Sequence, residues 1–108
     1  MFLRGEVVLC VLSGDFGKPR PAVVVQSDLF NETHSSITVC PLTSYLIQTP
    51  LFRITIEPNH ENGLQQISQI MVDKVSTIKI DKIREKIGVL DKATLFELNR
   101  ALRLWLDL

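Results

Sequence analysis

The stretch RPAVVVQ, residues 20–26, is the part of the sequence that most directly decides the fold. Three consecutive valines after an alanine predict a strand over 21–26, because β-branched side chains pack well on a pleated sheet. Two runs of the same kind lie on either side, EVVLCVL at 6–12 and SITVCPL at 36–42. Because short segments rich in turn-forming residues join them, the first part of the chain predicts three sequential strands.

Further strand signals follow in the middle of the chain. FRITI, residues 52–56, alternates polar and apolar side chains with the period of two expected of a half-buried strand. A turn-forming segment, 58–63, ends it. Residues 67–75 and 76–80 are also strand-like, and no turn dipeptide separates them.

A short helical turn followed by a loop is expected over 27–35, and the other helical character is expected near the C-terminus. Asp81 is expected to cap a short helical turn over 82–86, which Gly88 would close. Asp91 is the expected N-cap of the major helix, whose apolar stripe comprises Leu95, Leu98, Leu102, Trp105 and Leu106. The fold class is therefore mainly β (α+β), a twisted antiparallel sheet or open barrel with a C-terminal helix.

Size and charge restrict the function classes. A chain of 108 residues supports one domain, spanning 1–108. Its 12 basic and 12 acidic side chains cancel, so a nucleic-acid role must depend on local residues. The apolar runs are strand-length, far below the roughly 20 residues of a membrane span, and the amino end lacks a signal-peptide pattern. We expect a cytoplasmic protein.

The two cysteines and two histidines do not predict a metal site. Cys10 and Cys40 lie within β-branched runs and are expected to be small buried side chains. A zinc site would have to recruit His34 and His60 from polar loops, without the short paired spacings that such sites use.

Three motifs together resemble MazF/PemK toxins. Residues 20–28, RPAVVVQSD, match that family's strand motif RP-[AV]-VVVQ-x-D, and Gly17 and Lys18 come shortly before it. ITVCPLTS at 37–44 matches its V-x-P-L-T-S strand, and RGEV at 4–7 is similar to its usual opening. With the strand near Asp73 and the terminal helix, the similarity spans essentially the whole chain.

The resemblance implies an SH3-like barrel that forms a homodimer and cleaves single-stranded RNA sequence-selectively. The substrate's own 2′-hydroxyl would attack the adjacent phosphorus, giving 2′,3′-cyclic phosphate and 5′-hydroxyl ends without a metal or other cofactor. Arg20 would clamp phosphate oxygens, and Thr43 would donate to a non-bridging oxygen. Prolines on both sides of Arg20 restrict its backbone, which suits a fixed clamp.

Five further residues are candidates for RNA binding. Lys18 would meet a phosphate, Ser44 would assist Thr43, and Phe16 would either stack on a base or fold back on the core. Asp73 with Lys74 matches an acidic position that some relatives use in proton transfer or base recognition. Because Met71 and Val75 stand where several relatives carry arginine, an Arg–Asp pair within this strand is not expected.

Two alternatives to a ribonuclease are compatible with the sequence. CcdB, a gyrase-binding toxin without nuclease chemistry, shares the barrel and similar segments, but this chain ends LWLDL rather than with the Trp-Gly-Ile ending of that family. A barrel that has lost catalysis is the other. For a MazF/PemK toxin, the implied partner is a cognate antitoxin whose flexible segment folds over the RNA groove.

Overall fold

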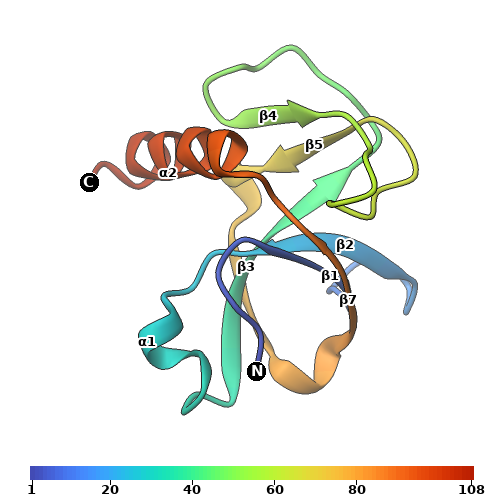
Figure 1. The fold of residues 1–108 in the computed structure, drawn as a ribbon, viewed down its shortest axis with the longest axis vertical. Coiled ribbons are helices and arrows are strands. Elements are labelled where there is room, and N and C mark those ends of the chain that lie inside the picture. Colours follow the sequence, from blue (N-terminus) through green and yellow to red (C-terminus); the bar gives the residue numbers. More distant parts are fainter.

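The valine-rich runs of the sequence form the centre of one antiparallel sheet. In the computed structural model, which describes residues 1–108, its strands are β1 (Glu6–Val11), β2 (Pro19–Val24), β3 (Ser36–Thr43), β4 (Arg53–Ile56), β5 (Ser68–Met71), β6 (Ser76–Lys79) and β7 (Ile83–Val89). The strand order is β4-β5-β3-β2-β1-β7, and β6 also pairs with β3. The helices are α1 (Asp28–Asn31) and α2 (Lys92–Leu106), and two 3-10 turns, η1 (Val72–Lys74) and η2 (Ile80–Lys82), flank β6. The sheet with its C-terminal helix confirms the predicted fold class (Figure 1).

The long strand β3 holds the two parts of the sheet together. Its first half, Ser36 to Val39, pairs with β6, and its last two residues, Leu42 and Thr43, pair with β5. On its other side β3 pairs with β2. The end of β3 therefore lies between β2 and β5, where both neighbours can bring side chains next to Thr43.

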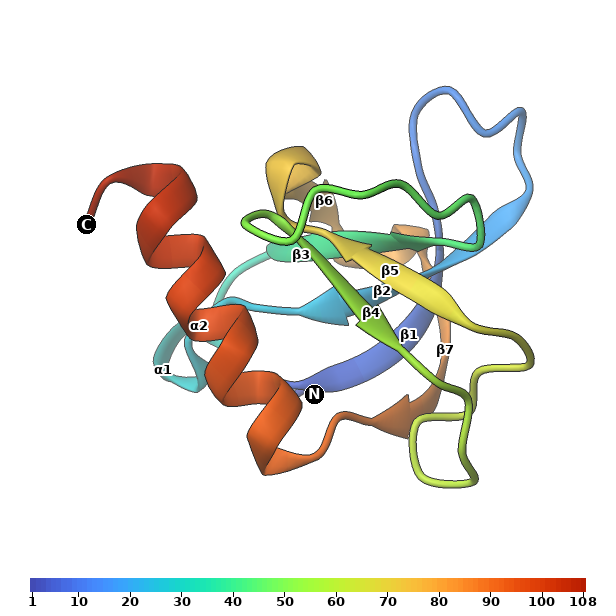
Figure 2. The same ribbon diagram turned by 90° about the horizontal axis from the view of Figure 1, so that it is seen from above.

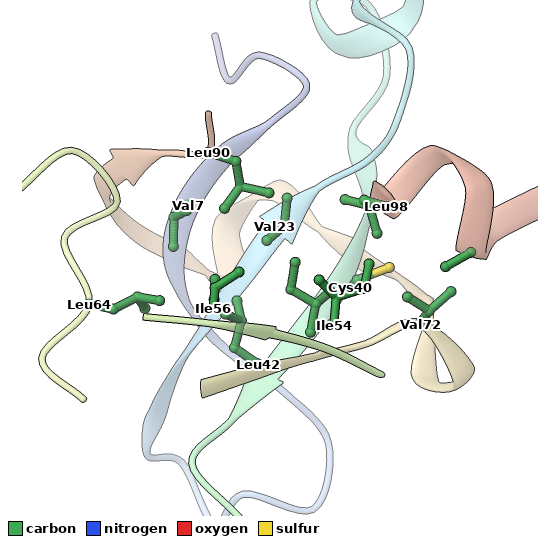
Figure 3. Packing of buried hydrophobic residues seen from close by; sticks show 12 residues of the cluster. Val7, Val23, Cys40, Leu42, Ile54, Ile56, Leu64, Val72, Leu90 and Leu98 are labelled. Atoms are coloured by element: carbon green, nitrogen blue, oxygen red, sulfur yellow. The ribbon is translucent and has the colours of Figure 1, made fainter. Parts of the chain in front are cut away.

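Side chains are buried on both faces of the central strands. Val7, Val23 and Cys40 pack with Leu98 in a cluster between the sheet and α2 (Figure 3). The residues that alternate with them, such as Val8, Ala22 and Val39, form a second cluster on the opposite face. Burial on two faces explains why the sequence shows continuous apolar runs here rather than a period of two.

The helix α2 begins as predicted. The Asp91 carboxylate accepts a hydrogen bond from the Thr94 N–H at 2.7 Å, and this bond lowers the pKa of Asp91. Leu98 is fully buried, whereas the last part of the predicted stripe is only partly covered. The Trp105 ring lies 5.4 Å from the Phe52 ring and remains about half exposed. No helix has the length and apolar character needed to cross a membrane.

One prediction is wrong. Residues 82–86 do not form a helical turn closed by Gly88, because 83–89 form strand β7, which pairs with β1. Asp81 lies in the 3-10 turn η2. Gly88 instead allows close packing of β7 against the 57–67 loop, since a side chain at this position would collide with the backbone of Asn62. The charged, exposed side chains of β7 are compatible with a helical turn, but its pairing with the distant strand β1 makes this segment a strand.

Candidate active site and RNA groove

The groove lies where the β1–β2 loop meets the end of β3. A cavity of about 800 Å³, here called the main groove, opens at this position. The β1–β2 loop projects from the body on the side away from the C-terminus, as both ribbon views show (Figure 2). Five of the seven predicted site residues line this groove: Phe16, Lys18, Arg20, Thr43 and Ser44.

Strand register brings Arg20 to Thr43. Ala22 pairs with Pro41 and Val23 pairs with Cys40. Continuing this register by two residues places Arg20 of β2 opposite Thr43 of β3. The guanidinium reaches that strand, because Nη1 of Arg20 donates to the Leu42 carbonyl at 3.1 Å. Two residues more than twenty positions apart in the sequence therefore form one constellation.

Arg20 is already paired in this structure. Its Nε and Nη2 donate to the two carboxylate oxygens of Asp15 at 2.9 and 3.1 Å. Asp15 lies in the β1–β2 loop, and the side chains of Arg20 and Asp15 are 33% and 18% exposed. Since Leu42 accepts from Nη1, every nitrogen of the guanidinium has a partner. A phosphate that binds Nε and Nη2 must displace the Asp15 carboxylate.

The Thr43 hydroxyl is positioned to donate. Its oxygen accepts a hydrogen bond from the Tyr45 N–H at 3.1 Å, and its own hydrogen remains available. Thr43 is half-buried and Ser44 is exposed. Thr43 can thus donate to an oxygen in the groove without losing its contact with the chain.

The loop that carries Phe16 has an unusual backbone. Gly14 and Gly17 have φ values of +90° and +79°, and Phe16 itself has φ of +54°. A non-glycine residue with positive φ is strained. Phe16 is 98% exposed, so it does not fold back on the core. Of the two expectations for this side chain, folding back on the core is wrong, and stacking on a base stays a prediction.

A second hollow, here called the side groove, joins the main groove. It has a volume of about 540 Å³ and shares Gly14, Asp15, Arg20 and Thr43 with the main groove. Lys74, Arg53 and Tyr45 also line it. Lys74 is exposed and makes no ion pair, so its charge is available to a ligand.

Asp73 lines neither groove and pairs with an arginine from another strand. Arg53 of β4 donates Nε and Nη2 to the two Asp73 oxygens at 2.7 and 3.1 Å. The hydrogen bond from Arg53 is the main cause that lowers the pKa of Asp73, with its positive charge adding to the effect. No local motif indicates this pair, because the two residues lie twenty positions apart on different elements. The interaction fixes η1 and hence the backbone next to Lys74.

Other titratable groups lie elsewhere. His34 and His60 are exposed and line neither groove. Cys10 and Cys40 are buried free thiols, as predicted, and burial raises their pKa values to about 11 and about 12. Thiols with such pKa values stay protonated near neutral pH and are poor nucleophiles. No group of three or more histidine, cysteine, aspartate or glutamate side chains gathers in metal-binding geometry.

Comparison with known proteins gives concordant matches along the chain. The family described as "PemK-like, MazF-like toxin of type II toxin-antitoxin system" matches residues 3–106. A probable endoribonuclease MazF of Mycolicibacterium smegmatis is 36% identical over 106 residues, covering 97% of this chain and 96% of the relative. Endoribonuclease MazF9 of Mycobacterium tuberculosis is 31% identical over 117 residues, covering 100% and 98%.

Solved structures show the same fold. An endoribonuclease in complex with its cognate antitoxin, from a mycobacterial species, superposes with a TM-score of 0.85 at 23% identity, covering 100% of this chain and 97% of that one. A MazE–MazF complex from Deinococcus radiodurans superposes with a TM-score of 0.79 at 23% identity, covering 99% and 97%.

Proposed function

The chain belongs to the family of PemK-like, MazF-like toxins of type II toxin–antitoxin systems, and from this membership we propose that it is an endoribonuclease acting on single-stranded RNA. Its relatives from Mycolicibacterium smegmatis and Mycobacterium tuberculosis carry that activity in their names. The observation that supports the proposal best is the meeting of Arg20 and Thr43 in an open groove.

The reaction is an internal transesterification. The 2′-oxygen of one nucleotide forms a bond to the adjacent phosphorus, and the bond from phosphorus to the 5′-oxygen of the next nucleotide breaks. The proton lost by the 2′-hydroxyl is balanced by one gained at the 5′-oxygen, which leaves a 2′,3′-cyclic phosphate and a 5′-hydroxyl. The nucleophile comes from the RNA, so the protein needs only to orient the substrate and stabilise negative charge.

Arg20 and Thr43 supply that stabilisation. The phosphorus gains negative oxygen charge in the transition state, and fixed donors aimed at it lower the barrier. The Arg20 guanidinium offers two parallel N–H groups once Asp15 has moved aside, and the Thr43 hydroxyl offers a third donor. Arginine is a very weak acid, so we assign it electrostatic stabilisation rather than proton transfer.

The other candidates divide along the two grooves. Phe16, Lys18 and Ser44 line the main groove, where an exposed aromatic ring and a cation suit a base and a phosphate. Lys74 lines the side groove and suits a further phosphate. Asp73 contributes indirectly, because its carboxylate is held by Arg53.

Partners and location follow from family membership. We infer a homodimer of toxin domains spanning 1–108, held inactive by a cognate antitoxin. Exposed apolar side chains near the end of α2, among them Leu104 and Leu108, offer surface of the kind that a partner covers. An RNA-cutting toxin acts where cellular RNA is, and we infer a cytoplasmic location.

The gyrase-binding alternative is not favoured. The match over residues 3–106 is to PemK-like and MazF-like toxins, and the relatives described above are endoribonucleases. A non-catalytic barrel would not require an arginine and a threonine that line the same open groove.

The test is cleavage of a long mixed-sequence single-stranded RNA with a metal chelator present. We expect discrete cuts with cyclic-phosphate ends for the wild type, and a loss of about 100- to 1000-fold for Arg20→Ala and a smaller loss for Thr43→Ala. Arg84→Ala is the matched control, since Arg84 is exposed on β7 and lines neither groove. Absence of cutting by folded, antitoxin-free protein would refute the proposal.

A further inference from the structure

The side groove carries an exposed aromatic ring directly after the Thr43–Ser44 pair. Tyr45 is 77% exposed and lines the side groove but not the main groove. It is the only tyrosine of the chain. The ring offers apolar surface that a ligand in the side groove can cover, because burying aromatic surface is favourable.

The backbone beneath this ring is fixed. The Tyr45 N–H is bound by the Thr43 hydroxyl oxygen. Ile47, two residues after Tyr45, is held by the buried Gln69 side chain. The Gln69 amide donates to the Ile47 carbonyl at 2.8 Å and accepts from the Ile47 N–H at 3.1 Å. The same Gln69 amide donates to the Thr55 hydroxyl, which ties the loop to β4. A pinned loop presents its side chain at a low entropic cost of ordering.

The two grooves meet at the proposed phosphate site. Arg20 and Thr43 line both, whereas Phe16 lines only the main groove and Tyr45 only the side groove. Each groove thus has one exposed aromatic ring in its lining, and Arg20 and Thr43 are common to both. Lys74, with no ion-pair partner, lies in the same groove as Tyr45.

We propose that Tyr45 is a base-stacking residue that binds a nucleotide in the side groove, on the opposite side of the scissile phosphate from the nucleotide that Phe16 holds. The inference rests on the proposed endoribonuclease function and extends it to substrate positioning. Every base has a flat face, so the ring provides affinity at that position, and Lys74 binds a neighbouring phosphate. The RNA therefore runs through both grooves and bends at Arg20.

The first test measures binding of a mixed-sequence RNA 12-mer pool with 2′-O-methyl riboses, which lacks the nucleophile and is not cut. We expect Tyr45→Ala to weaken binding about 10- to 100-fold and Tyr45→Phe to bind as the wild type does. The matched control is Leu51→Ala, since Leu51 is 65% exposed in the same loop and lines neither groove. Equal loss in Leu51→Ala, or no loss in Tyr45→Ala, would overturn the inference.

The second test assigns the side of the phosphate. Once the wild-type cut site is mapped, oligonucleotides with a deoxynucleotide at the scissile position carry an abasic residue at successive positions on each side. The penalty of Tyr45→Ala should vanish with an abasic residue on one side of the cut, and that of Phe16→Ala with one on the other. Penalties that persist for all abasic probes contradict stacking.

These outcomes separate the two proposals. Wild-type protein that cuts RNA while Tyr45→Ala binds normally refutes the role of Tyr45 and leaves the ribonuclease intact. Wild-type protein that neither binds nor cuts refutes both. A change in the sedimentation mass of Tyr45→Ala would show that the ring serves self-association, which also overturns the inference.

Discussion

At the scale of the residue, Asp15 controls the availability of Arg20. The carboxylate takes two of the arginine's hydrogen bonds and occupies the place of two phosphate oxygens. We expect Asp15→Asn, which has no charge to compete with phosphate, to bind the uncleavable RNA pool up to about fivefold more tightly, in line with about 1 kcal/mol for a partly exposed ion pair. Fluorescence anisotropy titration measures this effect. Asp81→Asn, an exposed acid away from both grooves, is the control, and weaker binding by Asp15→Asn would mean that Asp15 orders Arg20 for the substrate instead.

Asp73 gives a pH-dependent contribution to stability. Its pKa is lowered in the folded state, so the ionised form is favoured by folding. The stabilisation is fully present above the unfolded value of about 3.8 and is lost as the pH falls through the lower folded pKa. Since both partners are largely buried, Asp73→Asn should lose about 3 kcal/mol at pH 7 and show a shallower decline between pH 5 and pH 2.5. Urea unfolding across this range provides the measurement; parallel pH profiles for the two proteins would contradict the assignment.

The residue-level site could be predicted only where a local motif marks it. Arg20 and Thr43 stand in recognisable strings, and the structure brings them to one groove. Asp15 and Tyr45 belong to no such string, although each lies close in sequence to a motif residue. The Arg53–Asp73 pair was unpredictable, because it depends on how η1 follows β5 after that strand pairs with β4.

At the scale of the element, the β1–β2 loop holds the Phe16 ring exposed in a conformation that lowers the stability of the fold. Phe16 has positive φ and makes no core contact, so its backbone strain is not repaid by packing. Asparagine tolerates this conformation better than phenylalanine, and Phe16→Asn should raise the free energy of unfolding by up to about 1 kcal/mol while weakening RNA binding. Urea unfolding and RNA titration of the same preparation check both signs. A loss of stability would show that the ring packs on the protein.

A second loop, 57–67, is fixed by contact between backbones. Gly63 has φ of +71°, and a side chain there would overlap the carbonyl of Ile87. We expect Gly63→Ala to cost about 2 to 5 kcal/mol, from strain and overpacking together. Gly14 also has positive φ, but a side chain there would face open space. Gly14→Ala should therefore lower the free energy of unfolding by only about 1 to 2 kcal/mol. Thermal unfolding of the two variants separates collision from strain, and equal losses would contradict the collision.

Strands whose side chains are buried could be predicted from their apolar residues, whereas a strand that depends only on pairing with a distant segment could not. The runs that became β1, β2 and β3 are apolar on both faces and could be assigned directly. Strand β7 is exposed and rich in charge, and its conformation depends on β1, seventy or more positions away. Local capping signals at Asp81 and Gly88 therefore misled, whereas the Asp91 cap, which acts within one turn, was correct.

At the scale of the whole molecule, RNA binding should depend on few charges. The net charge is zero, and four cations line the grooves. Arg53 is held by Asp73, which leaves Lys18, Arg20 and Lys74 to meet phosphates. For single strands each contact contributes about −0.7 to the slope of log affinity against log salt, so we expect a slope of about −2. Titration from 50 to 300 mM salt measures it. Lys74→Ala should reduce the magnitude by about 0.7, and a much steeper slope would indicate a larger basic surface.

The Asp15–Arg20 pair also determines which anions can enter the groove. Asp15 is an intramolecular competitor, tethered five residues from the guanidinium, and its effective concentration is of the order of millimolar or above. A lone phosphate or nucleotide at lower concentration cannot displace such a competitor, because one contact replaces another at no gain. A polymer that also engages Lys18 and Lys74 adds contacts and can do so. The loop thus acts as a valency filter, which keeps the abundant small phosphates of the cell out of the site and admits the strand.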